Sequence, residues 1–267
     1  MSMYFKSFAS SSGGNCLALW TDRTAILIDC GLGSMKRTRQ MLTAHNAAAP
    51  PVSAVLVSHL HSDHIGYYPL RVFEQLAVPV HVHAGSVEPL RQRHFNGYGF
   101  GELALEAYAD SFSVGDLSVE PIAVSHSCPT FGFVIRCRAA DRWIKAVIAT
   151  DFNRPDDISG HLVDADFIFI ESNHDLALLK QYYNPNSRYH MPNPKTAELL
   201  ARARMQSKRA PAAVMLGHLS AQRNRPKIAI AEIENHFKQQ ALPLDFQLLA
   251  APQKEASETV HISGEIA

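Results

Sequence analysis

The sequence predicts an α/β (α+β) protein with two sheets. Six short apolar runs, rich in Val and Ile, are typical of strands buried on both faces. These runs are 25–28, 54–57, 122–124, 146–149, 167–170 and 213–216. Segments with helical periodicity lie between some of them. The apolar fraction, 46% of 267 residues, is large enough for a buried core and excludes a mainly disordered chain.

Three helices are expected around these runs. The first is expected over 32–48. The second begins at Asn193, which caps it, with Pro194 at the first helical position, and the third begins near Pro226. Consecutive strands are expected over 114–124, 131–138 and 142–150, and an edge strand over 259–262. We expect one domain over 1–267, with pseudo-halves of roughly 1–135 and 136–267 and a loose tail over 252–267.

Composition excludes several classes of protein. The 25 Lys and Arg balance the 25 Asp and Glu, so a globally basic protein that coats nucleic acid is excluded. No apolar run approaches the roughly 18 residues that a membrane span needs. The first residues contain no apolar signal core, so we expect a cytoplasmic protein. None of the four cysteines forms a CxxC pair, which argues against a zinc ribbon.

The segment after the second apolar run points to metal chemistry. Ser58 is followed by His59, His61, Asp63 and His64 within six residues. A tight turn can direct His59 and His61 to one metal ion and Asp63 and His64 to a second. Imidazole and carboxylate together suit Zn(II), Mn(II) or Fe(II). Three imidazoles buried without a metal would each need specific partners.

Other strand ends supply the remaining ligands. His126, Asp151 and His218 each follow an apolar run directly, and open α/β sheets place their sites at such ends. Asp151 is suited to bridging, because a carboxylate can offer one oxygen to each cation. The seven candidate ligands leave open positions for water and substrate, which is the pattern of a catalytic site.

The HxHxDH motif, followed by Gly66, resembles the signature of the metallo-β-lactamase fold hydrolases. The chain is most similar to their WalJ/YycJ-like branch, in which an SSGN-type start, an ESNHD segment and a GHLS segment occur. The corresponding segments here are 12–15, 171–175 and 217–220. The resemblance extends from about Phe5 to about Gln247.

The resemblance implies an αββα sandwich with a dinuclear site at one edge of its two sheets. It places His59, His61 and His126 on one metal ion and Asp63, His64 and His218 on the other, with Asp151 bridging. Members of the branch are exonucleases that act from 5′ ends of DNA, and related branches cleave small phosphodiesters or cyclic phosphates. We therefore expect two divalent cations and hydrolysis of phosphodiester bonds by a hydroxide that bridges them.

Further residues are assigned by chemistry. Asp63 is expected to orient the attacking hydroxide and take up its proton, and His174 to donate a proton to the leaving oxygen. Asp29 is expected to orient a ligand histidine. Asn15 and Ser220 are candidate contacts for phosphate oxygens.

A basic segment, residues 180–227, contains ten Lys and Arg and one acid, Glu198. It flanks His218 and predicts a surface for the DNA backbone, with Arg223 and Arg225 as phosphate contacts. Two alternatives remain open. The same ligands would serve a small phosphodiester, cyclic phosphate, lactone or thioester, and an inactive relative would be a metal-binding regulatory protein. A β-lactamase is disfavoured, because Asp63 and the complete ligand set suit phosphate substrates.

Overall fold

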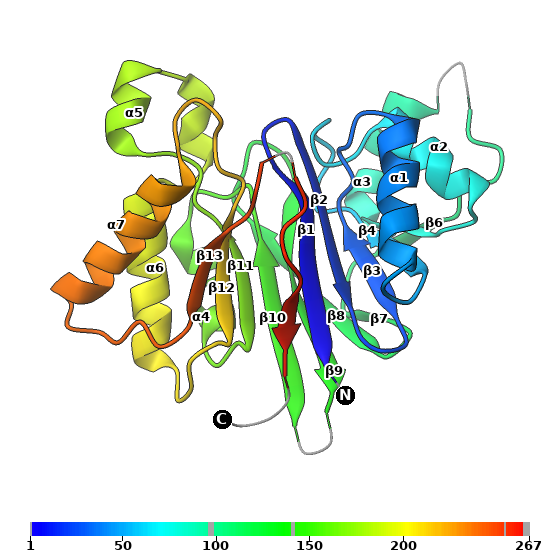
Figure 1. Cartoon of the computed structure of the whole chain (residues 1–267). Coiled ribbons are helices and arrows are strands. Elements are labelled where there is room, and N and C mark those ends of the chain that lie inside the picture. Colours follow the sequence, from blue (N-terminus) through cyan, green and yellow to red (C-terminus); the bar gives the residue numbers. More distant parts are fainter. Residues whose placement is uncertain (1, 96–98, 140–141, 254, 264–267) are drawn as a thin grey trace.

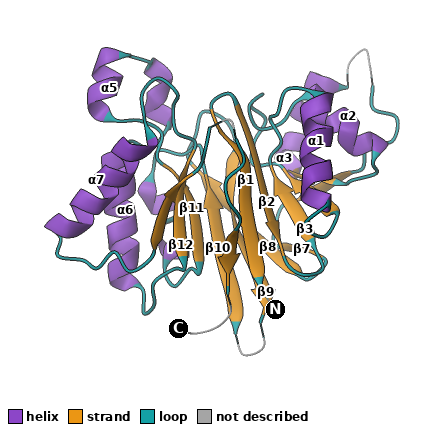
Figure 2. Ribbon diagram, in the orientation of Figure 1, coloured by secondary structure: helices purple, strands orange, loops and turns teal. Residues whose placement is uncertain are grey.

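The structure is a computed structural model that describes residues 2–95, 99–139, 142–253 and 255–263. Its strands form two seven-stranded sheets that pack face to face (Figure 1). Helices cover the outer face of each sheet, as the purple ribbons on both sides of the orange strands show in Figure 2. The four layers confirm the expected αββα sandwich.

The first sheet has the order β14, β1, β2, β3, β4, β5 and β6. Pairing is antiparallel from β14 to β3 and parallel from β3 to β6. The strands span Val260–Ile262 (β14), Met3–Ser11 (β1), Gly14–Trp20 (β2), Ala25–Ile28 (β3), Val52–Leu56 (β4), Val80–His83 (β5) and Leu105–Tyr108 (β6). The edge strand expected over 259–262 is present as β14.

The second sheet repeats this pattern in the order β7, β8, β9, β10, β11, β12 and β13. Pairing is antiparallel from β7 to β10 and parallel from β10 to β13. The strands span Phe112–Val114 (β7), Leu117–Val124 (β8), Thr130–Arg138 (β9), Trp143–Ala149 (β10), Phe167–Glu171 (β11), Ala213–Gly217 (β12) and Gln247–Ala250 (β13). The chain crosses between the sheets after β6, so residues 112–138 lie in the second sheet although the expected first half extends to 135.

The helices divide between the two outer faces. Beside the first sheet lie α1 (Met35–Asn46), α2 (Tyr67–Gln75) and α3 (Ala84–His94), and beside the second lie α4 (Ser159–Leu162), α6 (Asn193–Gln206) and α7 (Pro226–Gln239). The three expected helices correspond to α1, α6 and α7. The sequence did not predict α2, α3 or α4, and α3 carries Pro89 in its interior. Helix α5 (Leu176–Gln181) and the 3₁₀ helices η1 (Pro155–Asp157) and η2 (Pro185–Tyr189) complete the set.

Burial on both faces explains the short apolar runs. Along β11, Phe167 and Phe169 point into the core between the sheets, whereas Ile168 and Ile170 point toward the helices. Because side chains alternate along a strand, a strand with two covered faces has no polar positions. In the short apolar runs the polar residues therefore follow the end of the strand, and the loops that follow β4, β8, β10 and β12 meet at one edge of the molecule, at the top of Figure 1.

No helix in the described part of the chain is both long and apolar enough to cross a lipid bilayer.

Candidate metal centre

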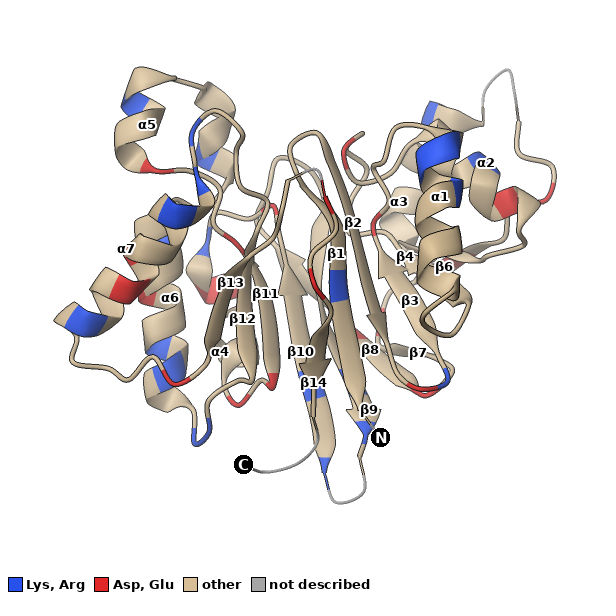
Figure 3. Ribbon diagram, viewed as in Figure 1, with Lys and Arg blue, Asp and Glu red and all other residues tan. Residues whose placement is uncertain are grey.

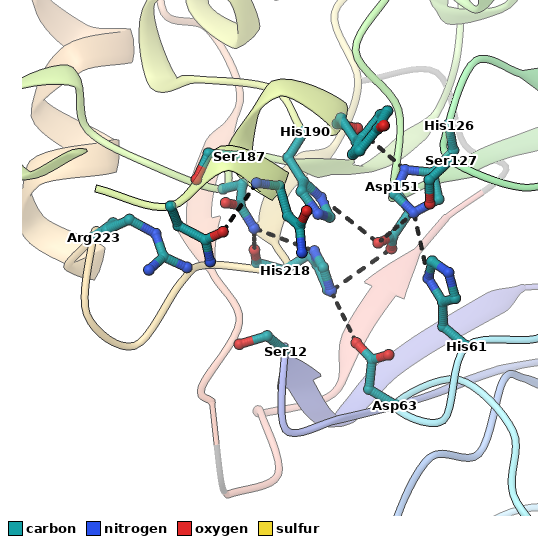
Figure 4. A pocket seen from close by; sticks show the side chains of 14 residues that line it. Ser12, His61, Asp63, His126, Ser127, Asp151, Ser187, His190, His218 and Arg223 are labelled. Carbon is teal, nitrogen blue, oxygen red and sulfur yellow. Dashed lines mark hydrogen bonds and ion pairs between the residues drawn. The ribbon is translucent and has the colours of Figure 1, made fainter. Parts of the chain in front are cut away.

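The seven side chains that the sequence singled out come together at this edge. Figure 4 shows those that line the pocket, which are His61, Asp63, His126, Asp151 and His218. The loop 59–64 follows β4, His126 follows β8, Asp151 follows β10 and His218 follows β12. Four of the seven, His59, His64, Asp151 and His218, are buried, whereas His61, Asp63 and His126 are partly exposed. The strand ends therefore place together residues that lie up to 159 positions apart, from His59 to His218.

A first trio consists of His59, His61 and His126. Its inward-facing nitrogens lie close together, with His59 Nε2 3.0 Å and His126 Nε2 3.4 Å from His61 Nδ1. The three rings pack at steep angles to one another, so their nitrogen atoms converge while the rings stay apart.

A second trio consists of Asp63, His64 and His218. Asp63 Oδ2 lies 3.5 Å from His64 Nε2 and 3.5 Å from His218 Nε2. A carboxylate oxygen and two imidazole nitrogens thus face one point.

Asp151 lies between the trios. Its Oδ1 is 3.8 Å from His126 Nε2 in the first trio. Its Oδ2 is 3.1 Å from His64 Nε2 and 3.7 Å from His218 Nε2 in the second. One carboxylate therefore offers an oxygen to each trio.

The outward-facing ring nitrogens of these histidines have partners of their own. His64 Nδ1 lies 2.7 Å from Asp29 Oδ2, and His218 Nδ1 lies 2.8 Å from Glu171 Oε1. His59 Nδ1 lies 3.0 Å from Ser58 Oγ, and His126 Nδ1 lies 3.2 Å from the Tyr189 carbonyl oxygen. An acceptor on the outer nitrogen holds a proton there and leaves the inner nitrogen as the ligand atom.

The orphaned oxygen of Asp151 tests whether these residues fit a metal ion. Asp151 Oδ2 is buried and accepts no hydrogen bond, although His64 Nε2 is near. A buried carboxylate oxygen without a partner is costly unless a cation neutralises it. Asp151 and His218 also have left-handed backbones, with φ of 60° and 52°, and such strain concentrates at functional sites. The donor set fits divalent cations.

The pKa shifts differ between the trios. Burial lowers the pKa of His59, His61 and His126. Burial alone would also lower the pKa of His218, but Asp151, Asp63 and Glu171 raise it to about 10. In the second trio, a protonated imidazole therefore balances the charge of the carboxylates. A bound cation would take the place of that proton.

Asp29 and Asn15 hold the loop 59–64 in place. Asp29 accepts hydrogen bonds from the Ser58 amide at 2.8 Å and the Ser58 hydroxyl at 2.7 Å, in addition to its contact with His64. Asn15 Nδ2 lies 3.3 Å from the Asp63 carbonyl oxygen and 3.0 Å from His64 Nε2. Gly31 permits this close packing, since a Cβ there would lie 1.9 Å from the Asp63 carbonyl oxygen. Asn15 is buried behind the ligands rather than facing the pocket.

A pocket of about 320 Å³ opens in front of the two trios. Arg223 and Ser12 lie at one end of it, and His61, His126 and Ser127 lie at the other (Figure 4). The residues of η2 and its flanks, from Asn184 to His190, form one wall.

His190 and Glu171 were not singled out from the sequence. His190 lines the pocket and packs against His126 and His218, and its Nδ1 lies 2.7 Å from Glu171 Oε1. It follows a 3₁₀ helix rather than a buried strand, so the strand-end pattern could not find it. Glu171 could have been found, because it is the last residue of β11.

Three residues expected near the substrate do not line the metal pocket. His174 is buried and does not line the metal pocket, and burial lowers its pKa to about 4. The Ser220 hydroxyl accepts a hydrogen bond from the Arg223 amide at 3.3 Å, so it shapes the loop. The Arg225 guanidinium donates to the carbonyl oxygens of Ala221 and Asn224.

The basic segment 180–227 is not one continuous stripe. Arg202 pairs with Asp156, and Arg204 pairs with Asp245. Figure 3 shows Lys and Arg distributed over α5, α6 and α7, with acidic residues between them. The acids that neutralise part of the segment come from elsewhere in the sequence, which a count along the chain cannot show. Of the Lys and Arg residues in this segment, Arg223 lines the metal pocket.

Comparison with known proteins agrees with this architecture. Residues 24–219 match the family described as the beta-lactamase superfamily domain. The exodeoxyribonuclease WalJ of Streptococcus pneumoniae serotype 2 is 25% identical over 245 residues, 88% of either chain. The exodeoxyribonuclease YycJ of Bacillus anthracis is 29% identical over 184 residues, 67% of this chain and 66% of that one. The metallo-beta-lactamase fold protein YhfI of Bacillus subtilis superposes with a TM-score of 0.69 at 15% identity, covering 96% of this chain and 99% of that one.

Proposed function

The chain belongs to the beta-lactamase superfamily and is a metal-dependent hydrolase, and we propose that its reaction is the cleavage of phosphodiester bonds in DNA, by an exonuclease activity. The position of Asp151 between two ligand trios, in a pocket that ends at Arg223, carries this proposal. The relatives named exodeoxyribonuclease WalJ and YycJ support the choice of DNA.

We assign two divalent cations to this site, Zn(II) or Mn(II) with Fe(II) as a further candidate. His59, His61 and His126 would hold one, and Asp63, His64 and His218 the other, with one oxygen of Asp151 directed to each. When bound, the cations would polarise the phosphoryl group and lower the pKa of a nearby water.

The Arg223 side chain provides the anchor for the phosphate group. Arg223 lines the pocket, and its buried Nε has no hydrogen-bond partner, so the guanidinium keeps a donor that protein groups do not satisfy. A phosphate oxygen would satisfy it and gain a charge-assisted hydrogen bond. Ser12 lies at the same end of the pocket and offers a hydroxyl (Figure 4).

Two side chains are placed to handle protons. Burial alone would raise the pKa of Asp63, but the His218 hydrogen bond and the nearby His64 lower it, so the carboxylate is ionised at neutral pH and can accept a proton from water. We place the donor to the leaving oxygen at His190 rather than at His174. Burial alone would lower the pKa of His190, but Glu171, whose Oε1 accepts a hydrogen bond from His190 Nδ1, raises it, so Nε2 also carries a proton that it can donate to the leaving oxygen.

A small phosphodiester is the second candidate substrate, because a pocket of about 320 Å³ can enclose a single nucleotide. The two substrates separate in one assay. Protein loaded with Mn(II) or Zn(II) is given 5′-phosphorylated duplex DNA, single-stranded DNA, RNA and bis(p-nitrophenyl) phosphate, and released products are quantified.

Arg223→Ala and Arg225→Ala form a matched pair for this assay. We expect Arg223→Ala to lower kcat/KM on DNA by roughly 10- to 150-fold, the value of a hydrogen bond to a charged group. Arg225→Ala should keep nearly wild-type activity, since its guanidinium donates to backbone carbonyls. Turnover of the small ester with DNA and RNA untouched would refute the nuclease, and equal losses in both variants would refute the role of Arg223.

A further inference from the structure

A second cavity, of about 360 Å³, adjoins the metal pocket. Asn184, Ser187 and His190 line both cavities. The segment 184–190, which contains η2, therefore forms a partition with the metal ligands on one side and the second cavity on the other. A ligand that extends across this partition would occupy both spaces.

The second cavity has the opposite charge character to the metal pocket. Arg188 and Lys195 are among the residues that line it, and none of the lining residues is acidic. The metal pocket, in contrast, is lined by Asp63 and Asp151. The second cavity therefore suits an anionic group without help from a cation.

The cations of this cavity are available for a ligand. Within the described residues, Lys195 is exposed and has no ion pair, whereas Arg202 and Arg204 on the same helix are paired with carboxylates. Arg188 donates a hydrogen bond to the Tyr189 hydroxyl and stacks 4.6 Å from the centre of that ring. This contact fixes the guanidinium while its other N–H groups remain able to donate.

An aromatic ring lies at the rim. Tyr183 lines the second cavity and is 78% exposed, the largest value among the exposed large apolar side chains of the described chain. Tyr182 and Leu176 nearby in the sequence are each close to half exposed, and α5 buries none of its residues. Bases stack on exposed aromatic rings of this kind in proteins that bind single-stranded nucleic acids.

We propose that the second cavity binds the nucleotide next to the scissile bond in a single-stranded nucleic acid. Lys195 and Arg188 contact its phosphate and Tyr183 stacks on its base, while the scissile phosphate lies in the metal pocket. This inference rests on the proposed function, because it takes the metal pocket to hold a phosphodiester. Binding of the adjacent nucleotide in the second cavity explains how a metal pocket that holds one nucleotide favours a polymer over a small phosphodiester.

Lys195→Ala and Lys208→Ala test the phosphate contact. Lys195 lies in the first turn of α6 and Lys208 lies just beyond its last residue, roughly 20 Å away along a helix of this length. Binding of a fluorescein-labelled oligothymidylate to the metal-free protein is measured by anisotropy over a series of salt concentrations. We expect Lys195→Ala to weaken binding several-fold and to reduce the slope of log K against log salt by about 0.7, while Lys208→Ala changes neither.

Tyr183→Ala and Tyr183→Phe test the stacking contact in the same assay. The alanine variant should bind roughly 5- to 150-fold more weakly, which corresponds to one stacked base, and the phenylalanine variant should bind like the wild type. With metal added, Lys195→Ala and Tyr183→Ala should also lower the ratio of oligonucleotide cleavage to hydrolysis of bis(p-nitrophenyl) phosphate.

The outcomes separate this inference from the proposed function. If the wild type cleaves the oligonucleotide while Lys195→Ala and Tyr183→Ala bind and cleave as it does, the second cavity is not a nucleotide site and the nuclease stands. If the wild type hydrolyses the ester but neither binds nor cleaves the oligonucleotide, the nuclease and this inference fall together.

Discussion

The two sheets present equivalent strand ends that have different partners. In the repeated pairing pattern, β3 of the first sheet corresponds to β10 of the second. Asp29 follows β3 and Asp151 follows β10, each with φ of 60° and each 2% exposed. Asp29 is satisfied by Ser58 and His64, whereas Asp151 Oδ2 accepts no hydrogen bond.

The difference shows how one scaffold position serves two purposes. In the first sheet, the loop after β4 carries the ligands and Asp29 fixes that loop. In the second sheet, Asp151 faces the space between the two trios, and Glu171 at the end of β11 fixes His218 and His190. Residue type, backbone conformation and burial are the same for the two aspartates, so their contacts decide which of them is a ligand.

Asp151→Asn should have the largest effect on activity. The amide keeps the size of the carboxylate but cannot offer a charged oxygen to each trio. We expect the loss in kcat/KM to exceed the roughly 10- to 100-fold typical of residues that orient ligands, with metal content reduced in elemental analysis. Circular dichroism of the metal-free variant should match the wild type. Full metal content with full activity would remove Asp151 from the site.

Asp29→Asn should have an intermediate effect of a different kind. In the variant, an amide nitrogen takes the place of one carboxylate oxygen of Asp29. That oxygen accepts a hydrogen bond from Ser58 or His64, so one of these buried donors loses its acceptor. We expect metal affinity to fall by roughly 10- to 100-fold and the free energy of unfolding without metal to fall by about 1–3 kcal/mol. Chelator competition and urea titration measure the two quantities. If Asp29→Asn lost as much activity as Asp151→Asn and contained no metal, the distinction between the two aspartates would be wrong.

Metal removal should lower the melting temperature by several degrees. A ligand at 100 times its Kd stabilises by about 2.7 kcal/mol, and each kcal/mol corresponds to roughly 2–4 °C for chains of this size. Calorimetry with and without EDTA measures the shift. The wild type should show it fully and Asp151→Asn should not. A shift of equal size in Asp151→Asn would mean that the cations bind elsewhere.

His174→Gln should have the smallest effect on activity, because His174 lies outside the metal pocket. Its effect should appear in the pH dependence of stability. Burial lowers the pKa of His174 to about 4 from its ordinary 6.5. Between these values the unfolded chain binds a proton that the folded chain does not, so stability falls as pH decreases from 6.5 toward 4. We expect urea titrations to show a shallower decline for His174→Gln. A large loss of kcat would instead restore His174 as the proton donor.

The sequence predicted the fold, and it located candidate ligands that the structure brings together, because both depend on local patterns. Strands buried on two faces leave polar residues only at their ends, so His126, Asp151 and His218 could be located from the sequence. The motif 59–64 is contiguous, and it needs one turn to form. His190 could not be found in this way, since a 3₁₀ segment between two helices has no periodicity that fixes where its side chains point.

The surroundings of the candidate substrate contacts were less predictable than those of the candidate ligands. Arg223 and Arg225 are two residues apart and chemically identical, yet one lines the pocket and the other donates to backbone carbonyls. Asn15 was expected to contact phosphate, but it holds the Asp63 carbonyl and His64. These outcomes depend on the three-dimensional path of each loop, which residue type and spacing do not determine.

Anomalous diffraction from crystals grown with Mn(II) or Zn(II) would test the central claim most directly. We predict two peaks, one surrounded by His59 Nε2, His61 Nδ1 and His126 Nε2 and the other by Asp63 Oδ2, His64 Nε2 and His218 Nε2, with an oxygen of Asp151 directed at each. A single peak, or two peaks of which neither contacts Asp151, would contradict the account.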